Sequence, residues 1–288
     1  MEKTAEVKKV TWISVAANIF LCLLKLVLGI LGSSQALVAD GIHSLSDMTT
    51  DIAILFGVKY WSAPADEDHP YGHGRIETIV TTFIGLILAM AALGIGYSAL
   101  GGIRDEHIQQ PGLIALAGAL VSILLKEGLY RWTFSVGKRI KSSALMANAW
   151  HQRTDALSSI PVALAVLIAV VNPAWSFVDH LGAFVVSLFI LHAAYKILKP
   201  SFIELTDSGV GDEVRQRIRQ SVLSVDGVKS VHALRTRKSG PGVYVDLHIQ
   251  VEGSMTVREG HDISGKVKHG LKNLGLEIID AVVHVEPV

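Results

Sequence analysis

The chain has 288 residues, of which 50% are hydrophobic and only 18% are charged, and its net charge is zero. These proportions are too apolar for an ordinary soluble domain, and the balanced charge gives no reason to expect a nucleic-acid partner. Cys22 is the single cysteine, so a disulfide or a cysteine-based zinc site within one chain is excluded. The composition therefore indicates a membrane protein with a more polar C-terminal part.

Six apolar windows are long enough to cross a hydrocarbon core about 30 Å thick. They lie near residues 10–32, 36–60, 77–101, 112–134, 145–171 and 177–198. The first window is too long for the apolar core of a signal peptide, and we expect it to be retained as a helix. Positive charges gather before the first window, at 138–141 and after the sixth window, so the positive-inside bias predicts cytoplasmic termini.

The pattern changes at about residue 206. Apolar residues recur every fourth position over 214–222, which predicts a helix, and they alternate strictly over 243–251, which predicts a strand. Strands are also expected at 228–237 and 278–286, and a capping box at Thr256 and Glu259 predicts a helix between the last two strands. We therefore expect an α-helical membrane protein, with a six-helix transmembrane domain over residues 1–205. A small cytoplasmic α+β domain over residues 206–288 follows it, in the order α-β-β-α-β.

Two copies of the pattern His-x-x-x-Asp lie inside apolar windows, at His43 with Asp47 and at His151 with Asp155. Residues four apart share one face of a helix, so each helix presents one imidazole and one carboxylate in the same direction. Two such faces supply an N2O2 set that suits a divalent ion such as zinc. Histidine titrates at about pH 6.5 and metal displaces ligand protons, so this quartet predicts that metal movement is linked to proton movement.

The alternative for each histidine is a hydrogen bond to a neighbouring helix. Two copies with the same spacing favour metal binding, because ionisable groups are expensive in a bilayer. Asp40 and Asp51 extend the same helix face, and they form either a path to the site or a set of hydrogen bonds to the ligands. Capping of the helix is a further possibility for Asp40.

Lys126 and Glu127 interrupt the fourth apolar window. They are expected to pair with each other or to extend toward the cytoplasmic interface, and a structural ion pair is favoured over the alternative of a role in transport.

The chain resembles the cation diffusion facilitator family of metal–proton antiporters. The matching segments are Ala39–Asp47, Asp68–Glu77 and His151–Ser159, and the resemblance covers nearly the whole chain. It implies six spans, a metallochaperone-like cytoplasmic domain, a homodimer and alternating access to a transport site at His43, Asp47, His151 and Asp155. A histidine at position 43 resembles the zinc-type quartet, although ligand affinity alone discriminates poorly between first-row metals.

The connection between the second and third windows holds further ligand types. The resemblance implies a second, more exposed metal site, and the alternative is a solvated acidic loop. The candidates are Asp66, Asp68, His69 and His73.

The C-terminal domain also carries possible metal ligands. The resemblance implies a binuclear site near the dimer interface that senses metal or closes the dimer, with a glutamate where aspartate is more usual at the last position. The alternative is scattered surface histidines. The candidates are His232, His248, His261, His284 and Glu286.

Arg75 and Asp207 stand at the starts of the third window and of the C-terminal domain. We hypothesise that they pair near a hinge. The alternative is two independent solvated charges, because an exposed pair contributes less than about 1 kcal/mol.

The favoured function is a multi-pass inner-membrane exporter that exchanges Zn2+ for H+, and Mn2+ or Fe2+ is the alternative substrate. Cd2+ is a further candidate ion for transport or regulation, and no organic cofactor is expected. A membrane metalloenzyme is disfavoured, because four ligands fill the tetrahedron and leave no open position for catalysis. A metal sensor is the remaining alternative. The expected partners are membrane lipid, divalent cations, protons and a second copy of the chain.

Overall fold

The computed structural model divides into two compact units. The first contains Met1–Ile52 and Ile84–Lys196, and the second contains Ala53–Phe83 and Ile197–Val288. The structure describes residues 2–104, 109–140 and 142–288, apart from the helical side chains of residues 2–6, 8, 47, 49–56, 58, 104 and 144.

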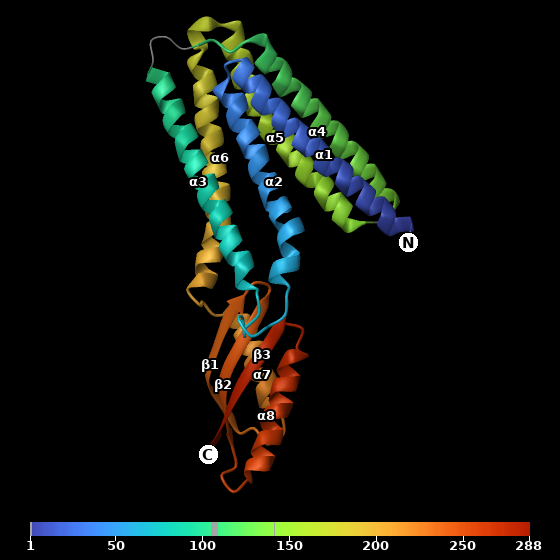
Figure 1. Cartoon of the computed structure of the whole chain (residues 1–288), viewed down its shortest axis with the longest axis vertical. Coiled ribbons are helices and arrows are strands. Elements are labelled where there is room, and N and C mark those ends of the chain that lie inside the picture. Colours follow the sequence, from blue (N-terminus) through green and yellow to red (C-terminus); the bar gives the residue numbers. More distant parts are fainter. Residues whose placement is uncertain (1, 105–108, 141) are drawn as a thin grey trace. The chain divides into compact units, whose positions relative to one another are not determined.

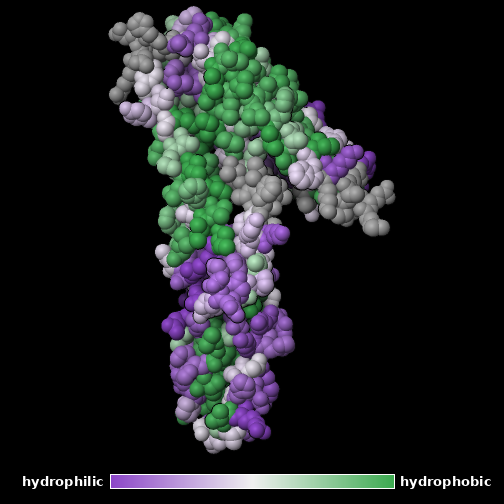
Figure 2. Space-filling model, viewed as in Figure 1, coloured by the Kyte–Doolittle hydropathy of each residue, from purple (hydrophilic) through white to green (hydrophobic). Residues whose placement is uncertain are grey.

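Six long helices make up most of the chain (Figure 1). Five described segments are long and apolar enough to cross a bilayer, and they belong to α1, α3, α4, α5 and α6. Large apolar side chains are exposed along these helices, and Figure 2 shows the hydrophobic surface that they form. The chain is therefore a multi-pass membrane protein. The helices are α1 (Glu2–Leu31), α2 (Gln35–Trp61), α3 (Arg75–Arg104), α4 (Leu113–Arg139), α5 (Ser143–Val171) and α6 (Phe177–Leu205), with a 3-10 turn at Pro173–Trp175.

Alanines make up much of the core of the first unit, beside larger aliphatic residues. Ala36, Ala39 and Ala115 are fully buried in it. At Gly32 an added Cβ would lie 2.7 Å from the Cβ of Ala115, so glycine is needed for this close approach. Small side chains let membrane helices approach closely where the hydrophobic effect gives no drive for association.

A buried carboxylate from α6 holds the start of α2. Asp179 is 1% exposed, and its Oδ1 accepts a hydrogen bond of 2.6 Å from the hydroxyl of Ser34. Its Oδ2 accepts bonds from the backbone N–H groups of Gln35 at 2.7 Å and Ala36 at 3.3 Å. The first N–H groups of a helix have no partner within the helix, so Asp179 satisfies two of them and ties α2 to α6.

The C-terminal part is a three-stranded sheet with two helices. In sequence order it contains α7 (Asp212–Leu223), β1 (Ser230–Ser239), β2 (Gly242–Val251), α8 (Val257–Lys272) and β3 (Ile278–Pro287). The sheet order is β1-β2-β3, with β1 antiparallel and β3 parallel to the central strand. The predicted order of helices and strands is confirmed, and so is the capping box at Thr256 and Glu259.

Alternation along β2 explains why the sheet has one buried face. Val245, Leu247 and Ile249 are at most 1% exposed and pack in one core with Ile218 of α7 and Val267 of α8. Successive side chains of a strand point to opposite faces, so the residues between them lie on the other face. That second face carries the polar side chains, including the histidines.

Candidate metal centres

The α5 motif places two possible ligands together. The Nδ1 atom of His151 lies 3.8 Å from Oδ1 of Asp155, and the two residues are one helical turn apart. The side chain of His151 is 58% exposed, whereas that of Asp155 is 14% exposed. A half-exposed imidazole thus lies beside a carboxylate that is largely removed from solvent.

The α2 motif is described in part. His43 is partly buried, and its Nδ1 atom is buried without a hydrogen-bond partner among the described residues. The side chains of Asp47 and Asp51 lie outside the described residues. Among the described side chains, His43, His151 and Asp155 do not gather into a three-ligand group, and the assignment of the quartet stays a prediction.

Lys126 of α4 binds the α5 carboxylate. Its Nζ donates a hydrogen bond of 2.8 Å to Oδ2 of Asp155, and the two side chains are 4% and 14% exposed. The expectation that Lys126 pairs with Glu127 or reaches the interface is therefore wrong. Glu127 instead accepts a 2.7 Å bond from Arg131, because the two are one turn apart on the exposed side of α4.

A second buried ion pair joins α1 to α2. Nζ of Lys25 lies 2.7 Å from Oδ2 of Asp40, and the two side chains are 1% and 3% exposed. The same ammonium donates to the hydroxyls of Ser44 at 3.2 Å and Ser159 at 3.0 Å, and Ser159 donates to Oδ1 of Asp40 at 3.1 Å. This network rules against a helix cap for Asp40, because its carboxylate binds side chains of α1 and α5.

Lys25 is a functional candidate that the sequence patterns above do not single out. A lysine inside an apolar window is a signal for a buried partner, and Asp40 lies in the next window. A buried lysine indicates that a carboxylate lies nearby, but the sequence does not indicate which carboxylate it is.

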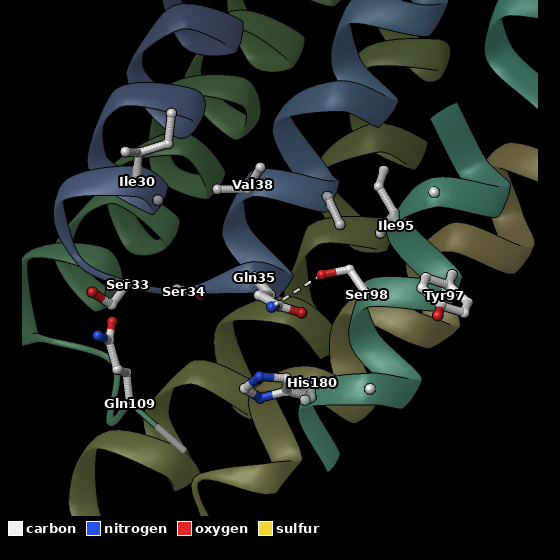
Figure 3. Close-up of a pocket in the computed structure, with 15 residues that line it drawn as sticks. Ile30, Ser33, Ser34, Gln35, Val38, Ile95, Tyr97, Ser98, Gln109 and His180 are labelled. Carbon is white, nitrogen blue, oxygen red and sulfur yellow. Dashed lines mark hydrogen bonds between the residues drawn. The ribbon is translucent and has the colours of Figure 1, made fainter. Parts of the chain in front are cut away.

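A cavity of about 740 Å3 with both polar and apolar side chains in its lining opens where α1, α2, α3 and α6 meet. Figure 3 shows Gln35, Ser98 and His180 at this cavity, with a hydrogen bond of 3.4 Å between Gln35 and Ser98. His180 is 8% exposed, and its Nδ1 has no hydrogen-bond partner among the described residues. Ala39 also lines the cavity, one helical turn before His43, so the cavity reaches close to the α2 motif along the helix.

The loop after α2 gathers three of its four candidate ligands. One ligand atom from each of Asp66, His69 and His73 lies within 4.8 Å of the other two. Oδ2 of Asp66 is 3.3 Å from Nε2 of His73, and its Oδ1 accepts a 2.6 Å bond from the backbone N–H of His69. That backbone bond lowers the pKa of Asp66, which keeps the carboxylate ionised. Asp68 is not part of this group.

The sheet aligns three histidines across its polar face. His232 of β1 is paired with His248 of β2, and His248 is paired with His284 of β3. Glu286 contacts two of them, with Oε2 at 2.9 Å from His232 and Oε1 at 2.7 Å from His248. His284 lies 3.5 Å from Oε1 of the same glutamate.

This sheet cluster, formed by His232, His248, His284 and Glu286, has suitable donors for a metal ion. Ligand atoms of His232, His248 and Glu286 lie within 4.8 Å of one another, and two imidazoles with one carboxylate are common zinc ligands. Hydrogen bonds from His248 and then His232 lower the pKa of Glu286, so its charge is retained for a cation. His261 stands apart on α8, where it lines a groove that Glu286 also lines.

Arg75 and Asp207 are in contact through Nη2 and Oδ1, with side chains 46% and 56% exposed. Glu204, which no sequence pattern singles out, lies near them on α6. Its Oε1 accepts hydrogen bonds from the hydroxyl of Thr78 at 2.6 Å and from the backbone N–H of Gly240 at 2.7 Å. The end of α6, the start of α3 and the β1–β2 turn are therefore linked through one carboxylate.

Comparisons with known proteins agree with this architecture. Residues 11–206 match the family model described as the cation efflux transmembrane domain, and residues 210–288 match that of the cation efflux protein cytoplasmic domain. Membrane-spanning helices with buried carboxylates, followed by a small α+β domain, define a class of transporters rather than enzymes. The chain belongs to the cation diffusion facilitator family, whose members carry divalent metal cations out.

Two relatives span almost the whole chain. The uncharacterized transporter MJ0449 of Methanocaldococcus jannaschii is 37% identical over 98% of this chain and 99% of its own length. The manganese efflux system protein MneS of Bacillus subtilis is 33% identical over 100% of this chain and 99% of its own length. Among solved structures, MamM-CTD 215-293 is 28% identical over 27% of this chain and 98% of its own, with a TM-score of 0.26.

Proposed function

We propose that this protein exports Zn2+ in exchange for H+ by alternating access. The main support is the position of Asp155. Its carboxylate is largely buried in a membrane-spanning helix, and His151 lies one turn away. His43, with its unpartnered buried Nδ1, and Asp47 complete the proposed transport site from α2. Two carboxylates compensate the charge of a dehydrated divalent ion, and two imidazoles add ligand strength without further charge.

Proton exchange follows from the same donors. The imidazoles bind protons when the metal leaves and release them when it binds. A site that faces each side in turn then carries protons one way and metal the other. The cavity that Ala39 lines supports the proposal, because it opens to within one helical turn of His43.

The positive-inside bias supports an inner-membrane location with both termini in the cytoplasm. A homodimer is proposed from the family relationship, with the sheet cluster as a regulatory metal site. A metal ion that binds one dimer arrangement better than the other shifts the population toward it.

Uptake of Zn2+ into proteoliposomes under an imposed pH gradient tests the transport mechanism. Asp155→Ala should reduce uptake by about a hundredfold or more, because loss of a buried ligand charge costs several kcal/mol. Asp212→Ala removes an exposed carboxylate of α7 and serves as the control, with uptake expected at the wild-type level. If Asp155→Ala takes up Zn2+ at the wild-type rate, the assigned site is wrong. If the rate of Zn2+ uptake by the wild type does not depend on the pH gradient, proton exchange is wrong.

Manganese is the second candidate substrate. Its support is the relationship to a protein named as a manganese efflux system. Competition by Mn2+, Fe2+ and Cd2+ against Zn2+ in the same vesicles separates the two. Zinc export predicts that Mn2+ at the same concentration as Zn2+ reduces Zn2+ uptake by less than half, and a reduction well beyond half would favour manganese export instead.

A further inference from the structure

Asp155 is already bound by a cation that belongs to the protein. The ammonium of Lys126 lies 2.8 Å from Oδ2 of Asp155, and both side chains are largely buried, at 4% and 14% exposed. The contact joins α4 to α5, which pack along each other. An oxygen of the proposed transport site is therefore occupied by a protein side chain.

A counter-charge is physically required at this position. A buried carboxylate without a cationic partner costs several kcal/mol, so an empty transport site must find compensation. Lys126 supplies it. An ammonium and a divalent cation cannot both contact the same carboxylate oxygen favourably, because the two positive charges repel each other at that separation.

The second buried lysine shows what a permanent pair looks like in the same unit. Lys25 contacts Asp40, Ser44 and Ser159, which come from two helices, and is 1% exposed. Asp155 is the single hydrogen-bond acceptor of Lys126 among the described residues, and it lies beside the half-exposed His151. A lysine on a flexible four-carbon stem with one acceptor can swing away, whereas one with three is fixed.

We propose that Lys126 is a tethered counter-ion that occupies Asp155 in the empty transporter and is displaced by the cargo metal. The inference rests on the proposed function, because it assumes that Asp155 binds the cargo. Lys126 then lowers the affinity of the site and promotes release, since its return to Asp155 competes with the bound ion. It also lowers the charge of the empty site, which eases reorientation of that site through a low-dielectric bilayer.

The test is the metal affinity of the purified full-length protein in detergent. Zn2+ binding is measured by calorimetry, and the component that Asp155→Ala abolishes is taken as the transport site. Lys126→Met should bind Zn2+ at this site at least about tenfold more tightly than wild type, because the competing charge is gone. Lys126→Arg keeps the charge and should bind close to the wild-type level. Lys229→Met removes an exposed lysine of the C-terminal domain and should show no tightening.

Three results would overturn the inference. The first is equal or weaker Asp155-dependent binding by Lys126→Met. The second is equal tightening by Lys126→Arg and Lys126→Met, because charge would then not be the cause. If Lys126→Met does not fold, Zn2+ binding by Lys126→Gln is measured in its place. The third result is Asp155-dependent Zn2+ binding by Lys126→Gln that is no tighter than that of wild type. A failure of the proposed function gives a different result. In that case Asp155→Ala binds and takes up Zn2+ as the wild type does.

Discussion

The helical unit and the sheet stabilise their carboxylates in different ways. In the helices, Asp155 and Asp40 each face a lysine, and the two ion pairs are almost entirely buried. In the sheet, Glu286 is 29% exposed and faces two histidines that are 32% and 46% exposed. An apolar surrounding requires an opposite charge beside a carboxylate, whereas exposure to solvent at the sheet stabilises a carboxylate without a lysine partner. A carboxylate buried between these helices is therefore paired with a lysine from a neighbouring helix.

The largest effect is expected when the buried charge of Lys25 is removed. Lys25→Met should destabilise the folded protein by about 3–5 kcal/mol, because Asp40 would remain buried without a cation. Unfolding by SDS titration of the protein in mixed micelles measures the loss. The double variant Lys25→Met with Asp40→Asn removes both charges and should recover much of the stability. If Lys25→Met unfolds at the same SDS fraction as the wild type, the ion pair is not needed for stability.

Loss of a charge in the sheet cluster should change the affinity for metal rather than the stability of the fold. Glu286→Gln keeps the shape of the side chain but loses the charge, so Zn2+ binding at this cluster should weaken by about tenfold or more. Calorimetry in an Asp155→Ala background isolates these sites from the transport site. Glu213→Gln on the exposed face of α7 is the control. Unchanged zinc binding in Glu286→Gln would mean that the cluster is a set of surface histidines.

The capping box of α8 offers a smaller effect with a defined pH dependence. Thr256→Ala should cost about 1 kcal/mol, seen as faster hydrogen exchange in the first turn of α8. The backbone N–H of Thr256 lowers the pKa of Glu259 below its ordinary 4.5. Glu259 therefore contributes its stabilisation fully above pH 4.5 and loses it as the pH falls below that value. Thr256→Ser keeps the hydroxyl and should protect α8 as wild type does, and equal exchange in Thr256→Ala would contradict the role of the cap.

The smallest stability effect is expected at Arg75 and Asp207. Both are about half exposed, so reversing either charge should cost less than about 1 kcal/mol of folding stability. If the pair couples the α3 start to the C-terminal domain, Arg75→Asp and Asp207→Arg should each lower vesicle uptake, and the double reversal should restore it. Activity that stays low in the double reversal would count against the coupling.

The helices and strands could be predicted because their signals are local. Alternation along 243–251 requires only that one face of a strand be buried, and the His-x-x-x-Asp spacing requires only a helical turn. The partners of Lys126 and Lys25 could not be predicted in the same way. Lys126 lies beside Glu127 in the chain, yet the rotation of α4 against α5 directs its ammonium to Asp155.

The sheet cluster depends in the same way on register. The histidines are visible in the sequence, but a shift of one residue between strands would send His248 to a different neighbour and separate Glu286 from His232.

The sequence alone determined the class of the protein, its helical and β segments and the ligand types in the two spans, because hydrophobic periodicity and residue chemistry are properties of short segments. Tertiary structure alone decided which lysine neutralises which carboxylate and which three histidines form a row. The physical reason is that electrostatic partners in an apolar interior are chosen by helix rotation and strand register. Both depend on packing between segments that are distant in the chain.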